Sequence, residues 1–183
     1  MQYTVIRSNR KTLALQIKDG DLIVRAPRKA KRAEIDAMID QHRLWIEKHW
    51  QKAEQHRQAA EALEPLTMEE IHALADQALK VIPERVRYFA PLIGVTYGRI
   101  TIRNQRTKWG SCSAQGNLNF NCLLMLTPPE VLDSVVVHEL CHRKEMIHSD
   151  RFYAEILRVF PDHRKWDKWL KDKGPVLMQR MRV

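Results

Sequence analysis

Cysteine is scarce in this chain, and long apolar runs are missing. The 183 residues include only three cysteines, Cys112, Cys122 and Cys141. Their odd number and wide spacing give neither a disulfide framework nor a paired C-x-x-C zinc signature, so we expect a reduced compartment. No apolar stretch approaches the roughly 20 residues of a membrane helix, and the first residues lack the apolar segment of a secretory signal. We therefore expect a cytoplasmic protein with no membrane partner.

Acidic residues are also in deficit. The chain has 22 Asp and Glu against 31 Lys and Arg, which gives a formal charge of +9 and a pI near 9.7. Such a charge raises encounter rates with polyanions, so a nucleotide or nucleic acid held by the basic surface is one expected partner. Solubility alone explains the same charge, and the fingerprint motifs of common nucleic-acid-binding folds are missing.

Secondary-structure patterns divide the chain near residue 66. Residues 13–17 (LALQI) and 21–26 (DLIVRA) flank a turn at residues 18–21, which predicts a hairpin closed by Pro27. Residues 31–63 contain neither Gly nor Pro and predict one long helix. We expect residues 1–66 to form an appendage of the same domain as a hydrolase core in residues 67–183.

The second part mixes helices with short strands. Capping boxes at Thr67 and Thr127 predict two helix starts, the second with Pro at its first position. Residues 99–103 predict a strand, and residues 117–126 alternate apolar and Asn side chains as a half-buried strand does. The expected fold class is therefore α+β, with a small mixed or antiparallel sheet and an active-site helix, preceded by the hairpin and the long helix.

The sequence from His138 to His142 reads H-E-L-C-H and carries the chemistry. On a helix, positions i and i+4 lie one turn apart on one face, so both imidazoles reach one ion. Glu139 follows the first ligand and stands where a carboxylate takes a proton from metal-bound water. The motif predicts a catalytic zinc with Glu139 as general base.

A catalytic zinc usually has three protein ligands and a water, so the motif needs a third donor. His148 is the expected one, because the chain is able to double back after the helix. No Gly marks that turn, and Glu145 and Glu155 are the competing candidates.

Other residues are candidates for the cleft or for substrate contact. Residues 117–126 either form an edge strand that pairs with an extended peptide or one more core strand. Tyr153 either stabilises a developing oxyanion or packs in the core. The full set of candidates is Arg106, Trp109, Asn119, Asn121 and Tyr153.

Four segments together resemble the YgjP-like metallopeptidase family: RTKWGSC at 106–112, GNLNFN at 116–121, VVVHELCH at 135–142 and HSDRFY at 148–153. The resemblance implies a minimal zincin-like metallopeptidase, related in motif to SprT-like proteases that act near DNA. It also implies zinc ligands at His138, His142 and His148 and a catalytic Glu139. Residues 109–112 resemble a family hallmark, in which we expect Gly110 to permit a tight turn and Trp109 to pack beneath the site.

The expected activity is zinc-dependent hydrolysis of peptide bonds in a peptide or protein substrate. Some members of the family are labelled UTP pyrophosphatases, and the basic residues that would then grip a triphosphate are Arg103, Arg106, Lys108 and Arg143. The missing P-loop and the three imidazoles speak against that alternative. A third alternative is a basic nucleic-acid-associated module with a structural zinc, whose site a fourth protein ligand would close.

Overall fold

The computed structural model describes residues 3–18 and 20–181. Asp19, which belongs to the expected hairpin turn, lies outside the described residues. The chain divides into two compact units, residues 1–63 and 64–183. None of the helices in the described part of the chain combines the length and apolarity that a membrane crossing requires.

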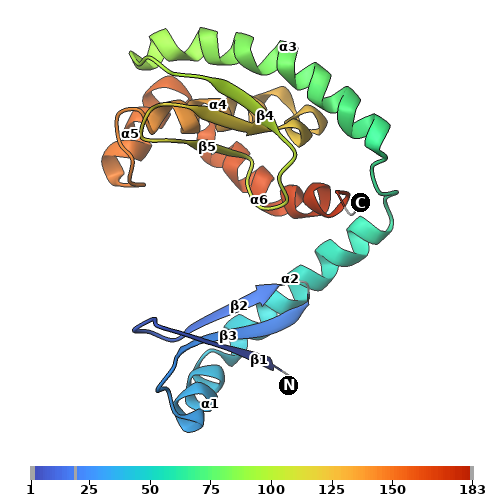
Figure 1. Cartoon of the computed structure of the whole chain (residues 1–183), viewed down its shortest axis with the longest axis vertical. Coiled ribbons are helices and arrows are strands. Elements are labelled where there is room, and N and C mark those ends of the chain that lie inside the picture. Colours follow the sequence, from blue (N-terminus) through green and yellow to red (C-terminus); the bar gives the residue numbers. More distant parts are fainter. Residues whose placement is uncertain (1–2, 19, 182–183) are drawn as a thin grey trace. The chain divides into compact units, whose positions relative to one another are not determined.

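The first unit holds a three-stranded mixed sheet (Figure 1). Its strands are β1 (Tyr3–Ser8), β2 (Ala14–Lys18) and β3 (Asp21–Pro27), in the order β1-β3-β2. The expected hairpin is confirmed, because β2 and β3 pair antiparallel with Leu15 opposite Val24. β1 pairs parallel with β3, so both strands run toward the same end of the sheet. Alternate residues of β3, from Leu22 to Ala26, are buried.

The single long helix expected for residues 31–63 is wrong. Two helices occupy this segment, α1 (Arg32–Gln41) and α2 (Arg43–Glu61), separated at His42. The backbone of His42 leaves the helical region, and its ring nitrogen Nδ1 lies 3.1 Å from the carbonyl oxygen of Met38. Side chain and backbone here compete for the same carbonyl, which ends the first helix. The break lets both Ile35 and Ile46 be buried, one on each helix.

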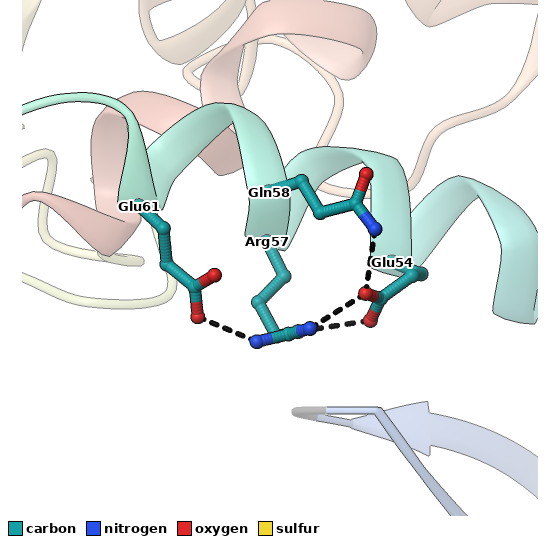
Figure 2. Close-up of polar contacts among 4 residues, drawn as sticks. All are labelled: Glu54, Arg57, Gln58 and Glu61. Carbon is teal, nitrogen blue, oxygen red and sulfur yellow. Dashed lines mark hydrogen bonds and ion pairs between the residues drawn. The ribbon is translucent and has the colours of Figure 1, made fainter.

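The end of α2 is stabilised by its own polar side chains (Figure 2). Arg57 donates to Glu54 through Nε at 2.8 Å and to Glu61 through Nη1 at 2.5 Å. Gln58 donates to the same Glu54 at 2.9 Å. These residues are three and four positions apart, the spacing at which helix side chains meet. They support a helix segment in which few apolar side chains are buried.

The second unit packs its helices around a mixed sheet and one central helix. The strands are β4 (Ile100–Arg103), β5 (Gly110–Cys112) and β6 (Leu118–Asn121), and a 3-10 turn, η1 (Cys122–Leu126), follows them. The helices are α3 (Met68–Ile93), α4 (Pro129–Cys141), α5 (Asp150–Val159) and α6 (His163–Gln179). α4 contacts α3, α5 and α6, and it also contacts β5 (Figure 1). The fold class is therefore α+β.

The strand expected for residues 117–126 is only half right. β6 ends at Asn121, whose side-chain oxygen accepts from the amide of Leu123 at 3.1 Å and starts the 3-10 turn. Cys122, Leu123 and Leu124 are all buried, which a strand with alternating faces does not allow. The sheet order β4-β6-β5 also places β6 in the centre, so the expected edge strand at these residues is wrong.

The two expected helix caps have different outcomes. At Thr67 the capping box is present: the hydroxyl accepts from the amide of Glu70 at 3.2 Å, and the Glu70 carboxylate accepts from the amide of Thr67 at 2.8 Å. At Thr127 the box is wrong, because the hydroxyl donates backward to the carbonyl of Leu124 at 2.8 Å. α4 instead starts with Pro129 at its first position, where a missing N–H costs nothing.

Candidate metal centre

The centre is built at the C-terminal end of α4. His138 lies in the last turn, and His142 is the residue that caps the helix. Their rings meet edge to face, with centroids 5.0 Å apart. The i, i+4 spacing on a helix explains this meeting, because the two side chains leave the same face one turn apart. α4 is apolar on most sides up to this point and is largely buried, so the two imidazoles stand on a rigid support.

His148 reaches the same point from the loop between α4 and α5. Its Nε2 lies 3.1 Å from Nε2 of His138, and one ring nitrogen from each of the three histidines lies within 4.8 Å of the others. The loop turns without glycine and passes into α5 through Ser149, whose hydroxyl accepts from the amide of Phe152 at 3.3 Å. This cap follows His148 directly, so it holds the histidine at the mouth of the site.

Phe152 forms the floor under all three imidazoles. It is fully buried, and its ring centroid lies 4.6 to 5.0 Å from those of His138, His142 and His148. Two of these contacts are edge-to-face, the geometry that aromatic pairs prefer. An apolar ring beneath a group of ligands limits their rotation and keeps water out from below.

The carbonyl of Glu145 and the ring of His163 also contact the imidazoles. Nδ1 of His142 lies 3.2 Å from the carbonyl oxygen of Glu145, which leaves Nε2 of that ring free for an ion. The buried His163 of α6 lies 6.0 Å from His138 between ring centroids, and its Nδ1 lies 2.8 Å from the hydroxyl of Ser134. Sequence reasoning misses His163, because nothing in its spacing connects it to the motif.

The electrostatics of the centre favour neutral imidazoles. Burial, followed by the charge of His142 and His148, lowers the pKa of His138 to about 3. Burial likewise lowers the pKa of His142. A neutral imidazole is the form that donates its lone pair to a metal. The donor set therefore fits a metal ion that prefers nitrogen ligands, such as zinc.

Glu139 follows His138 directly in α4, but its side chain points toward a different element of the fold. Its side chain is buried, with 6% exposed. Burial raises the pKa of Glu139 to about 8, and the nearby charge of Lys108 acts in the opposite direction. The wall it faces is β5: a Cβ built on Gly110 would lie 2.6 Å from Oε1 of Glu139. A side chain at this position would force the Glu139 carboxylate to shift.

Of the two competing third ligands, Glu155 has its carboxylate engaged by other side chains. The Glu155 carboxylate accepts from Nζ of Lys144 at 2.7 Å and from Nη2 of Arg158 at 2.5 Å. Glu145 contributes its backbone carbonyl to His142. Within the described residues, the group of side chains able to hold a metal ion consists of the three histidines.

Comparison with known proteins identifies the family of this chain. A family model described as YgjP-like, metallopeptidase domain, matches residues 11–74 and 69–173. The chain belongs to the YgjP-like family. It is thus a hydrolase of the metallopeptidase kind, and the resemblance in its motifs is confirmed. The sequence matches no curated protein.

Two solved structures are similar to part of this YgjP-like chain. One is the crystal structure of the metallopeptidase zymogen of Pyrococcus abyssi abylysin, 19% identical, which covers 50% of this chain and 93% of its own with a TM-score of 0.46. The other is that of the metallopeptidase zymogen of Methanocaldococcus jannaschii jannalysin, 22% identical, which covers 52% of this chain and 98% of its own with a TM-score of 0.46.

The segment from Trp109 to Cys112, the expected hallmark of the YgjP-like family, forms the wall opposite α4. Gly110 is a strand residue paired with Phe120, so the tight turn expected there is wrong. Trp109 packs on α6, where a Cβ added to Gly174 would lie 3.1 Å from the indole. Trp109 thus joins α6 to β5, the strand that faces Glu139.

The two asparagines of β6 hold this wall in place. Asn119 donates to the hydroxyl of Ser111 at 3.2 Å. Asn121, only 1% exposed, donates to the carbonyls of Gln105 at 2.6 Å and Lys108 at 3.0 Å. The amide of Asn121 thus fixes the loop before β5. That loop carries Arg106 with its side chain exposed.

The remaining candidates lie at the rim. Tyr153 is 40% exposed, and its ring lies 6.3 Å from that of His148 in a stacked orientation. It is therefore a surface residue beside the centre, and packing in the core is excluded. Arg143 donates to the carbonyls of Thr96 at 3.0 Å and Ala114 at 3.1 Å, so its guanidinium joins two loops.

Proposed function

We propose that the chain is a zinc-dependent peptidase in which His138, His142 and His148 hold the metal. The observation that carries this proposal is the convergence of three imidazole nitrogens within 4.8 Å of one another beside a buried Glu139. Three histidines leave one coordination position open, as catalytic zinc sites do. A structural zinc site would be closed by a fourth protein ligand, and no such side chain joins the group among the described residues.

Zinc bound there would supply a Lewis acid and lower the pKa of a water molecule at the open position. Glu139 is the residue placed to accept a proton. Burial raises the pKa of its carboxyl group to about 8. Its ionisation is favoured once a cation occupies the three imidazoles, because a nearby positive charge lowers a carboxyl pKa. Glu139 then acts as the general base near neutral pH.

The open edge of β5 supports an extended peptide as substrate. The amide of Asn121 bonds to the carbonyl of Trp109, and the amide of Ser113 bonds to the carbonyl of Asn117. Because hydrogen-bonded pairs alternate along an antiparallel ladder, the N–H and C=O of Gly110 and Cys112 point to the other edge. No strand within the described residues pairs with that edge.

A substrate strand added to β5 would run past the active carboxylate. Gly110 is both a residue with outward-facing backbone groups and the residue in contact with Glu139. Main-chain hydrogen bonds to a sheet edge give affinity for any extended peptide, whatever its sequence. The peptide-pairing edge expected from the sequence is therefore assigned to β5 in place of residues 117–126.

The test combines metal content with turnover. Wild type, Glu139→Gln and His148→Ala are purified without added metal, and zinc is measured by elemental analysis. We expect about one equivalent of zinc in wild type and in Glu139→Gln, and a large loss in His148→Ala. Turnover of an unfolded protein substrate should fall at least about 100-fold in Glu139→Gln, as expected for loss of a general base.

Two outcomes would overturn the proposal. Unchanged turnover in Glu139→Gln removes the general base from the mechanism. Hydrolysis of UTP by the zinc-loaded wild type, with no cleavage of any protein substrate, would assign the centre to nucleotides instead.

A further inference from the structure

The first unit has a strongly basic end, formed by residues 7–13 and 25–32. Eight Lys and Arg fall in these two segments, which contain no Asp or Glu: Arg7, Arg10, Lys11, Arg25, Arg28, Lys29, Lys31 and Arg32. The two segments meet because β1 and β3 are parallel. Ser8 lies opposite Pro27, so the loops that follow the two strands leave the sheet at the same end (Figure 1).

Arg7 fixes the backbone conformation of the basic end. Nη1 of Arg7 donates to the carbonyls of Pro27 at 3.2 Å, Arg28 at 3.1 Å and Ala30 at 2.8 Å. The amide of Ala30 also bonds to the carbonyl of Pro27 at 3.1 Å. The loop after β3 is therefore tied to the end of β1, and its charges are presented from a defined backbone.

The charges of the basic end are exposed and little neutralised. All eight side chains except Arg10 are exposed. Arg32 lies 3.8 Å from Asp36 but is 86% exposed, which makes this ion pair weak. Lys11, Arg28 and Lys29 form no ion pair with any described residue. Charges of one sign at one end of a small sheet add to a local positive potential that attracts polyanions.

We propose that the basic end binds the phosphate backbone of nucleic acid. Phosphate contacts in such complexes come from Arg and Lys together with Ser, Thr and Asn side chains, and Ser8, Asn9 and Thr12 lie within the same loops. An anionic membrane is disfavoured because the two segments expose no large apolar side chain that would enter a bilayer. The protein binds phosphates here, so binding depends on salt and only weakly on base sequence.

The experiment measures binding of the full chain to fluorescently labelled DNA and RNA of random sequence, by anisotropy at several salt concentrations. The variant Lys11→Gln, Arg28→Gln, Lys29→Gln removes three charges from the basic end. The matched control, Lys80→Gln, Arg87→Gln, Arg99→Gln, removes the same charge from exposed positions of the second unit. Circular dichroism and thermal unfolding check that both variants remain folded.

We expect the basic-end variant to bind at least about ten times more weakly than wild type, with the control within about two-fold. The slope of log affinity against log salt should fall by about one for each phosphate that the variant no longer neutralises. A chelator that removes zinc should leave the affinity unchanged, because the histidines take no part. Equal weakening in both variants would overturn the proposal, as would binding to phosphatidylserine vesicles without binding to DNA or RNA.

Discussion

The carboxylate of Glu139 lies against the α-carbon of Gly110, so closely that a methyl group at residue 110 would sit 2.6 Å from Oε1 and 2.7 Å from Cγ of the glutamate. Both residues are held firmly, one in the buried helix α4 and the other in β5, paired with Phe120. This contact joins the motif on the helix to the segment from Trp109 to Cys112. The position of Glu139, the general base that we propose, therefore depends on residue 110 having no side chain.

Gly110→Ala should therefore damage catalysis without removing the metal. The added methyl must push the Glu139 carboxylate away, and small displacements of a catalytic group cost about 100-fold in rate. We expect kcat to fall by about 10- to 100-fold while zinc content stays at the wild-type level. Ser111→Ala, one residue along β5, loses only the hydrogen bond from Asn119 and leaves the contact with Glu139 intact, so this control should keep most activity. Full activity in Gly110→Ala would show that the contact does not position the base.

Phe152→Ala should loosen the metal centre and destabilise the second unit. The ring is fully buried beneath three imidazoles, so its removal leaves a cavity that typically costs about 3–5 kcal/mol for Phe to Ala. The histidines gain freedom, so zinc affinity should fall in a competition assay with a chelator. Tyr153→Phe keeps the neighbouring aromatic ring and should change neither quantity strongly. Unfolding in denaturant and chelator competition measure the two effects.

Stability should depend on Glu155 in a defined pH range. Hydrogen bonds from Arg158, followed by those from Lys144, lower the pKa of Glu155 to about 2, below the ordinary 4.5. The stabilisation is fully present above pH 4.5 and is lost as the pH falls through 2. Because Lys144 and Arg158 are 41% and 52% exposed, we expect only about 1 kcal/mol.

The variant Glu155→Gln measures this contribution. It should be less stable than wild type at pH 6, and the difference should disappear near pH 2. Zinc content should stay unchanged, because the carboxylate is engaged with two cations. A loss of zinc in Glu155→Gln would make the residue a ligand after all.

Arg143→Lys should affect stability more than turnover. The guanidinium donates to the carbonyls of Thr96 and Ala114 through two different nitrogen atoms. A lysine has a single side-chain nitrogen and does not reach both carbonyl oxygens in this geometry. Loss of one such bond costs about 1 kcal/mol. We expect a lower melting temperature and an unchanged KM for a peptide substrate. A strong rise of KM for UTP in this variant would instead support a phosphate-binding role for Arg143.

Local patterns in the sequence were sufficient for the parts of the site that lie within one element. His138 and His142 meet because a helix brings positions i and i+4 together, and this holds whatever surrounds the helix. The Thr67 cap was predictable for the same reason. The family motifs indicate which other segments belong to the site, but they do not show how the side chains pack.

Predictions failed where neighbouring elements decide the outcome. Residues 122–124 are all apolar, and their burial under α3 favours a 3-10 turn over a continued strand. The break at His42 has a local cause instead, the contact of its ring nitrogen with the carbonyl oxygen of Met38. Hydrophobic periodicity does not reveal this break, because one continuous helix and two separate helices both satisfy local propensity.

By itself, the sequence determined the α+β class, the helical metal motif with His148 as the candidate third ligand, and the excess of positive charge. Only the tertiary structure decided that Phe152 supports the three imidazoles, that Gly110 makes room for Glu139, and that β5 is an edge strand of its sheet. It also decided that two basic loops meet at one end of β1 and β3. Contacts between residues distant in the chain depend on strand order and packing, which short-range periodicity does not encode.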